Sequence, residues 1–209
     1  MIDKLEKQLG EDYALINKSS DSVYIQIYRK SESGINPETY VEVIENEGNY
    51  HLYLVQRNKQ FTKAVFEQKN EALFVSGIYA ISKLGNQLRN EQVQNDILDL
   101  KPDDFSMLNN ILVREVGAQY YSIMQEKVKV INLEQGKDTN LFNIYYLADA
   151  TAEKKYLVTD RRAPNAFLVL YNFAIKLKNA NYNIDKWNNI FMVNQEQIEL
   201  AKQLYIGIK

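Results

Sequence analysis

The sequence contains no cysteine and a single histidine, His51, among its 209 residues. The absence of thiols excludes disulfides, thiolate metal sites and a cysteine nucleophile, and it fits a reducing compartment. A general base needs a positioned partner, and a metal site needs further ligands. Nothing in the sequence supplies either for His51, so we interpret it as a structural residue of a strand. We expect no metal and no cofactor.

Proline and glycine are also scarce, with three and eight residues, which leaves little room for linkers or low-complexity tracts. The longest apolar run, residues 166–175, is interrupted by Asn172. It is shorter than the roughly 18–20 residues of a membrane-spanning helix. The first ten residues, MIDKLEKQLG, lack the basic and apolar regions of a signal peptide. We therefore expect a cytoplasmic protein that makes no membrane contact.

The composition is that of an ordinary globular protein, with 45% hydrophobic and 25% charged residues and a formal net charge of -2. Neither half of the chain has an excess of basic residues, which argues against nucleic acid as a partner. Tyrosine is abundant, with 15 residues. Tyrosine buries a ring while keeping a polar tip wet, so it suits interfaces. An AT-rich genome would produce the same bias without functional meaning.

Hydrophobic periodicity predicts the same order of elements in both halves of the chain. In the first half we expect a helix at 2–9, strands at 23–29, 39–45, 50–56 and 61–67, and a helix at about 70–88. In the second half we expect a helix at 102–117, strands at 119–125, 127–133, 143–149 and 154–160, a helix at 164–179, and a final helix at 195–205.

Two closely similar segments indicate an internal repeat. FVSGIYAISKL occupies positions 74–84 and FLVLYNFAIKL occupies positions 167–177, an offset of 93. Upstream, YHLYLVQ (50–56) matches FNIYYLA (142–148) at an offset of 92. We therefore predict an α+β fold of two tandem α-β-β-β-β-α units with antiparallel sheets, each covered by a helix, plus a C-terminal helix. The predicted domains are residues 1–95 and residues 96–209.

The helix at 164–179 is apolar on most of its sides, and Phe167 lies on its most apolar stripe. A helix of this kind has to be covered on more than one side. One sheet covers a single side, so we expect the other unit or a partner protein to cover the rest, and we favour two closely packed units with the paired helices near a shared core. Phe167 is predicted to be a core residue.

Two polar clusters have simple structural interpretations. Asp99, Asp103 and Asp104 precede an apolar-periodic stretch, where an aspartate caps a helix N-terminus. A metal site needs more convergent oxygen ligands than this spacing provides. Arg161 and Arg162 precede a helix N-terminus, a place where phosphates bind. No glycine-rich loop accompanies them, so a solvated pair or a loop ion pair is the simpler interpretation.

The hairpin sequence YVEVIENEGNYHLYLVQ (40–56), followed by a covering helix in a cysteine-free, mildly acidic chain, resembles the immunity proteins of bacterial polymorphic toxin systems. The resemblance is one of overall style across both halves and transfers no functional residue. It implies stoichiometric binding to a cognate toxin domain, without turnover and without a cofactor. The partner would then be a protein toxin, and the protein would not be an enzyme.

Under that resemblance the partner-binding residues are aromatic anchors and acidic side chains in the first unit. The aromatic anchors are Tyr24, Tyr28, Tyr40 and Tyr53, and the acidic residues are Glu42, Glu45 and Glu47. The alternative for the acidic residues is a solvated strand face. Two other function classes stay open: a small-ligand protein or enzyme with a cleft between the units around His51, Arg161 and Arg162, and a self-associating structural protein.

Overall fold

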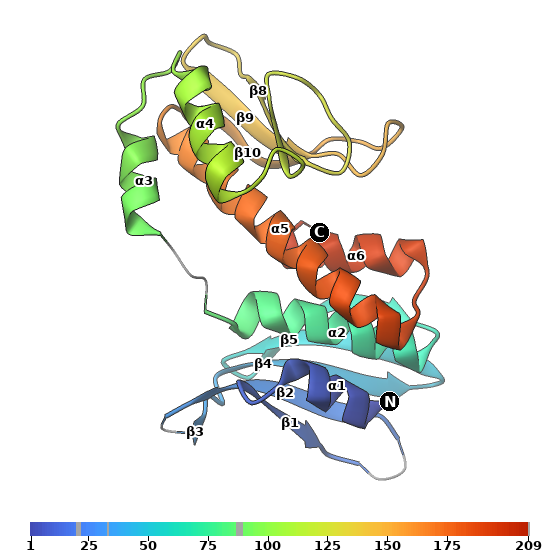
Figure 1. Cartoon of the computed structure of the whole chain (residues 1–209). Helices are drawn as coiled ribbons and strands as arrows, with labels where there is room; N and C mark the ends of the chain where they lie inside the picture. The colour runs from blue at the N-terminus through green and yellow to red at the C-terminus, as the bar shows by residue number, and fades with distance from the viewer. Residues whose placement is uncertain (20–21, 33, 87–89, 209) are drawn as a thin grey trace. The chain divides into compact units, whose positions relative to one another are not determined.

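A computed structural model describes residues 1–19, 22–32, 34–86 and 90–208 of the chain (Figure 1). The predicted α+β class is confirmed: the chain forms two sheets with helices packed on them. It divides into two compact units, the first formed by residues 1–86 with 180–207 and the second by residues 87–179. The C-terminal helix, which we expected in the second unit, therefore belongs with the first.

The first unit is built on a six-stranded antiparallel sheet with the strand order β1-β2-β4-β5-β6, and β3 pairs with β2. Its elements are α1 (Ile2–Leu9), β1 (Tyr13–Asn17), β2 (Tyr24–Ser31), β3 (Gly34–Ile35), β4 (Thr39–Asn46), β5 (Asn49–Gln56), β6 (Lys59–Phe66), α2 (Lys69–Leu84) and α6 (Gln195–Ile206). The turns β4–β5 and β5–β6 are two-residue turns with positive φ at both central positions, which suits the twist of a hairpin.

The core of the first unit lies between this sheet and α2. Alternate residues of the central strands, such as Ile25, Val41 and Leu52, are buried beneath the helix. Every residue of α2 from 71 to 80 is buried, so the helix is covered on more than one side. The second cover comes from α6 and from the end of α5, whose Trp187 is buried in the same core.

The second unit has a four-stranded sheet with the order β10-β9-β8-β7. Its elements are α3 (Glu91–Leu98), α4 (Phe105–Glu115), β7 (Tyr121–Ile123), β8 (Ile131–Gln135), β9 (Leu141–Tyr146), β10 (Lys155–Arg162) and the first part of α5 (Asn165–Phe191). The predicted strand at 127–133 begins only at Ile131. The segment between β7 and β8 is a loop that returns the chain to the level at which β7 began. As a result β7 runs parallel to β8, and the predicted fully antiparallel sheet is not found.

Three phenylalanines form the core of the second unit, and they join both layers. The Phe167 ring contacts Phe142 of the sheet with ring centroids 5.4 Å apart and Phe105 of α4 at 5.9 Å. Phe167 is fully buried, as predicted. A cover for this part of α5 that we did not predict comes from α3 and α4 of the same unit: Gln94 donates a hydrogen bond to Asn172 in α5.

Helix α5 continues beyond its predicted end near residue 179 to Phe191. The segment 165–191 contains neither glycine nor proline, so nothing in it terminates a helix. Its residues up to 179 belong to the second unit and those from 180 onward belong to the first. In the part of the chain that the structure describes, no helix has the length and apolarity needed to cross a membrane.

Each unit contains three consecutive strands followed by a helix, in the same order. In the first unit these are β4, β5, β6 and α2, and in the second β8, β9, β10 and α5; both sets of strands are antiparallel meanders. The preceding strand differs, because β2 is antiparallel to β4 whereas β7 is parallel to β8. The repeated order seen in the sequence therefore corresponds to a β-β-β-α core with different additions.

Candidate functional site

Helices α1 and α2 contact each other and pack on one face of the six-stranded sheet (Figure 1). The strand residues that are buried in the core with these helices, such as Ile25, Val41 and Leu52, belong to that face and not to the opposite one. Side chains alternate along a strand, so the strand register identifies the residues of this opposite face. We call it the tyrosine face. Its central residues are Tyr24, Gln26, Tyr28, Tyr40, Glu42, Ile44, His51, Tyr53 and Val55, with Gln60 and Thr62 from β6; Ala14, Ile16, Lys30 and Val65 lie around them.

The tyrosine face brings together five of the seven residues predicted to bind a partner. They are Tyr24, Tyr28, Tyr40, Glu42 and Tyr53. Glu42 lies opposite Gln26 on β2 and opposite Tyr53 on β5, so it sits in the middle of the group. The sequence placed these residues on three strands, and the register of the sheet places them next to one another.

Glu42 on β4 is held by amides from the adjacent strand β2 and from β6, beyond β5. The Gln26 Nε2 donates to Glu42 Oε1 at 2.7 Å, and the Gln60 Nε2 donates to Glu42 Oε2 at 2.6 Å. The Tyr28 hydroxyl donates to Gln26 Oε1 at 2.7 Å, which fixes the orientation of that amide. The Glu42 side chain is only 1% exposed. The Glu42 carboxyl group is thus held in one orientation beneath the surface of the tyrosine face.

The tyrosines around Glu42 form a closely packed group. The Tyr28 and Tyr40 rings have centroids 4.8 Å apart and are tilted by 34°. Burial, together with the phenol of Tyr40 and the charge of Glu42, raises the pKa of Tyr28 to about 12. Burial, the charge of Glu42 and a hydrogen bond to it raise the pKa of Tyr24. These phenols are therefore neutral donors at physiological pH, and they present rigid aromatic surface.

Glu45 and Glu47 lie elsewhere. Glu45 pairs with Tyr50 on the side of the sheet that carries the helices, and its Oε2 accepts a hydrogen bond from the Val23 backbone N–H at 3.0 Å. Glu47 is exposed in the turn after β4. Residues three apart on a strand point to opposite faces, so the predicted acidic strip is divided among three environments.

The remaining candidates from the sequence belong to different elements. His51 is on the tyrosine face, where its ring stacks on Tyr53 at 6.2 Å, whereas Arg161 and Arg162 are on β10 in the other unit. Asp104 precedes α4, as expected of a capping residue. Its side chain, however, accepts from the Lys101 backbone N–H at 2.7 Å and makes no cap hydrogen bond.

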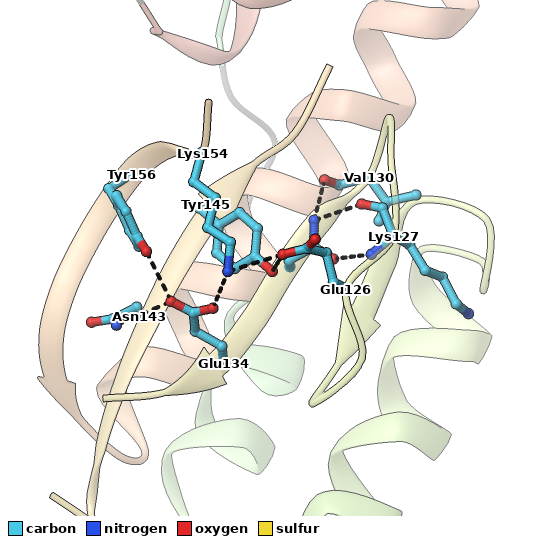
Figure 2. A network of polar contacts seen from close by, with 9 residues as sticks. Glu126, Lys127, Val130, Glu134, Asn143, Tyr145, Lys154 and Tyr156 are labelled. Carbon is cyan, nitrogen blue, oxygen red and sulfur yellow. Dashed lines mark hydrogen bonds and ion pairs between the residues drawn. The ribbon is translucent and has the colours of Figure 1, made fainter. Parts of the chain in front are cut away.

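A second polar network lies on the sheet of the second unit, on the face opposite Phe142 (Figure 2). Lys154 Nζ lies 2.7 Å from Glu134 Oε2 and 2.9 Å from Glu126 Oε2. The same ammonium lies over the Tyr145 ring, 4.4 Å from its centroid. Tyr145 donates its hydroxyl proton to Glu126, and Tyr156 donates to Glu134. The network combines one cation, two carboxylates and two aromatic rings.

The charges of this network shift the pKa values of its carboxyl groups. Hydrogen bonds from Lys154 and Tyr145 lower the pKa of Glu126. Burial acts against ionisation of Glu134, yet hydrogen bonds from Lys154, Asn143 and Tyr156 hold its pKa below the usual value. The two carboxylates in turn raise the pKa of Lys154. Lys154 is therefore a fixed cation, which is unsuited to act as a nucleophile.

One position of the tyrosine face has a sequence equivalent in the polar network of the second unit. Tyr53 and Tyr145 are equivalent at the 92-residue offset, and each lies opposite a buried polar residue of the preceding strand. In the first unit that residue is Glu42. In the second it is Asn132, whose side chain forms hydrogen bonds with the backbone of Lys127 and Val130 in the loop before β8.

Sequence reasoning missed Gln26, Gln60 and Lys154. Gln26 alternates with Tyr24 and Tyr28 in the same strand, so the period of two places it on their face. No comparable local signal identifies Gln60 or Lys154. Gln60 reaches Glu42 from β6, across the intervening strand β5, and Lys154 precedes its strand.

Each unit has a hollow among its described residues. One of about 530 Å³ in the second unit is lined by Pro102, Asp138, Asn140, Leu141, Arg162 and Ala163. The other, of about 450 Å³ in the first, lies between the end of α5 and α6 and is lined mainly by asparagine and other polar side chains. No group of three or more metal-ligating side chains occurs among the described residues.

Comparison of the chain with protein-family models, curated protein sequences and solved structures gives no match.

Proposed function

We propose that the protein is a non-catalytic binding protein that docks a partner protein on the tyrosine face of its first unit. The observation that supports this most is the grouping of Tyr24, Tyr40 and Tyr53 as partly exposed aromatic side chains on the sheet face opposite the helices. Tyrosines of this kind are favoured interface anchors, because a ring with two rotatable bonds loses little entropy on binding.

The hydrogen bonds beneath the rings support the same proposal. Gln26 and Gln60 fix Glu42, and Tyr28 fixes Gln26. A surface whose side chains are already ordered spends less free energy on ordering when it binds. The partner in this proposal is a toxin domain that the protein neutralises by stoichiometric binding, as the resemblance to immunity proteins implies.

The test uses the intact protein as bait in a lysate of its native host, followed by co-expression with the captured protein. Three baits are compared: the wild type, Tyr40→Ser/Tyr53→Ser on the tyrosine face, and Tyr182→Ser. Tyr182, on α5, is 69% exposed and lies outside the face. We expect the wild type and Tyr182→Ser to capture the same protein in a 1:1 complex and to restore the growth of cells that express it.

The face variant should lose both capture and protection while keeping its circular-dichroism spectrum. Equal capture by all three baits would exclude the tyrosine face as the interface. A captured protein that is harmless when expressed without the bait would exclude neutralisation.

A further inference from the structure

The Glu42 carboxylate lacks a cation. Its side chain is almost fully buried, and its two oxygens accept hydrogen bonds from the uncharged amides of Gln26 and Gln60. No lysine, arginine or histidine nitrogen among the described residues lies within 4.0 Å of it. A buried carboxylate without a positive partner is costly, and a nearby cation would be attracted strongly because the local dielectric is low.

The rest of the tyrosine face does not balance this charge. Its other residues around Glu42 are tyrosine, glutamine, threonine, histidine and aliphatic side chains. Lys30, which the alternation also places on this face, is exposed near the end of β2 and belongs to none of the ion pairs of the described residues. The tyrosine ring faces add the negative end of their quadrupoles. The face is therefore largely uncharged at its surface and negative beneath it.

The second unit contains the kind of occupant that such a face accepts. There Lys154 lies over the ring of Tyr145, the equivalent of Tyr53, and pairs with two glutamates on the open side of the sheet (Figure 2). The first unit has the tyrosines and the glutamate but no lysine or arginine of its own at this place within the described residues. A cation from another molecule would meet the same kinds of group on the tyrosine face, aromatic rings and a carboxylate, although at different strand positions.

Resting on the proposed function, we infer that the partner protein inserts a cationic side chain, arginine or lysine, over the Tyr28–Tyr40 ring pair, where the Glu42 carboxylate balances its charge. Gln60 is the group that gives way. It is exposed and comes from the edge strand β6, and its amide occupies a donor position on Glu42 Oε2 that a guanidinium or ammonium would fill.

The experiment titrates the protein with Nα-acetyl-arginine methylamide and, as a matched neutral control, with the citrulline derivative of the same shape. Binding is followed by NMR from the ring signals of Tyr24, Tyr28 and Tyr40. We expect saturable shifts with the arginine compound and at least ten-fold weaker binding of the citrulline compound. Glu42→Gln, which keeps the shape of the side chain and removes the charge, should weaken arginine binding at least ten-fold.

Two variants complete the test. Glu134→Gln, which changes a carboxylate of the other sheet, should leave arginine binding at the tyrosine rings unchanged. Gln60→Ala removes the competing donor and should strengthen arginine binding, so the inference is testable even if Glu42→Gln does not fold. Equal binding of arginine and citrulline, wild-type affinity in Glu42→Gln, or weaker binding in Gln60→Ala would overturn it.

Failure here and failure of the proposed function are distinguishable. If Tyr40→Ser/Tyr53→Ser abolishes capture of the partner but arginine and citrulline bind alike, the face is an interface and only the cationic anchor is wrong. If arginine binds at the rings but the same double variant captures the partner normally, the cation site is present and the proposed interface is wrong.

Discussion

The indole ring of Trp187 lies directly on Gly77 of α2, and a methyl group added at Gly77 would overlap the indole ring. Trp187 is 1% exposed, and it also packs against Phe191 with ring centroids 6.0 Å apart. The glycine in the middle of this helix is thus explained by a close contact. Glycine costs about 1 kcal/mol relative to alanine in a helix interior, so the tryptophan contact has to be worth more than that.

Gly77→Ala is expected to lower the free energy of unfolding by about 1–3 kcal/mol, because the overlap outweighs the gain in helix propensity. Trp187→Ala should cost about 3–5 kcal/mol through the cavity it leaves. In the double variant the overlap with the indole is gone and only the Leu5 side chain, 2.8 Å from the added methyl group, has to shift, so the two losses should not add. Urea unfolding of all three variants checks this, and a stabilised Gly77→Ala protein would contradict the contact.

Phe167→Ala should lower the free energy of unfolding by about 3–5 kcal/mol, because the ring is fully buried between Phe105 and Phe142. Val113→Ala, at a position that is 48% exposed on α4, is a suitable control and should change stability by less than about 0.5 kcal/mol. The measurement is the denaturant midpoint of each variant. Equal midpoints for Phe167→Ala and the wild type would show that the ring is not part of the core.

Charge reversal should change the free energy of unfolding by different amounts at Glu42 and Glu47, two residues of the predicted acidic strip. Glu42→Lys places an ammonium against the donor amides of Gln26 and Gln60 in a buried site, so we expect a loss of about 3 kcal/mol or more. Glu47→Lys, in the exposed turn, should stay within about 0.5 kcal/mol of the wild type. Thermal unfolding at neutral pH compares the two. A harmless Glu42→Lys would mean that the site is open to solvent.

Lys154→Met should raise the pKa of Glu134 toward its usual value, because the ammonium and its hydrogen bond are removed. In the wild type the depressed pKa contributes stability that is present above the ordinary glutamate pKa of 4.5 and is lost as the pH falls through the folded-state value. NMR titration of the carboxyl carbon measures both proteins. Identical Glu134 titration curves in the two proteins would show that Lys154 does not lower the pKa of Glu134.

Alkaline pH should destabilise the protein. The pKa values of Tyr28, Tyr79, Tyr145 and Tyr205 are raised to about 12, first of all by burial. Their contribution to stability is fully present below the unfolded-state pKa of about 10 and is lost as the pH rises through the folded-state value. Tyrosinate absorbance and Trp187 fluorescence should therefore change together. Full tyrosine ionisation near pH 10 without unfolding would contradict this burial.

Local sequence patterns predicted the elements that depend on local periodicity. The β-β-β-α order of both units and the burial of Phe167 followed from alternation and helical spacing. The loop before β8 could not be predicted this way, because Val128 and Val130 alternate as in a strand. Met124 and Lys129 instead adopt positive φ, and the Asn132 side chain bonds the loop backbone.

The candidate site shows the same division. The sequence indicated tyrosines and glutamates on neighbouring strands, but it could not indicate that Gln26 and Gln60 both meet Glu42. That arrangement depends on the register of four strands, and a shift of one residue would move Glu42 to the opposite face. The same register separates Glu45 from Glu42. Long-range pairing therefore decides which of the predicted residues share a site.

The assignment of residues 180–207 to the first unit has a consequence for synthesis on the ribosome. Two hydrogen bonds join α2 to residues 123 positions later in the chain. The Ser82 hydroxyl donates to the Tyr205 carbonyl, and the Asn194 amide donates to the Glu71 carboxylate. At about 5–20 residues per second, roughly 6 to 25 seconds pass between the emergence of α2 and that of its cover. During that time its apolar outer side is open to water and to other nascent chains. The unit that the ribosome begins first is completed only after the whole second unit has been made.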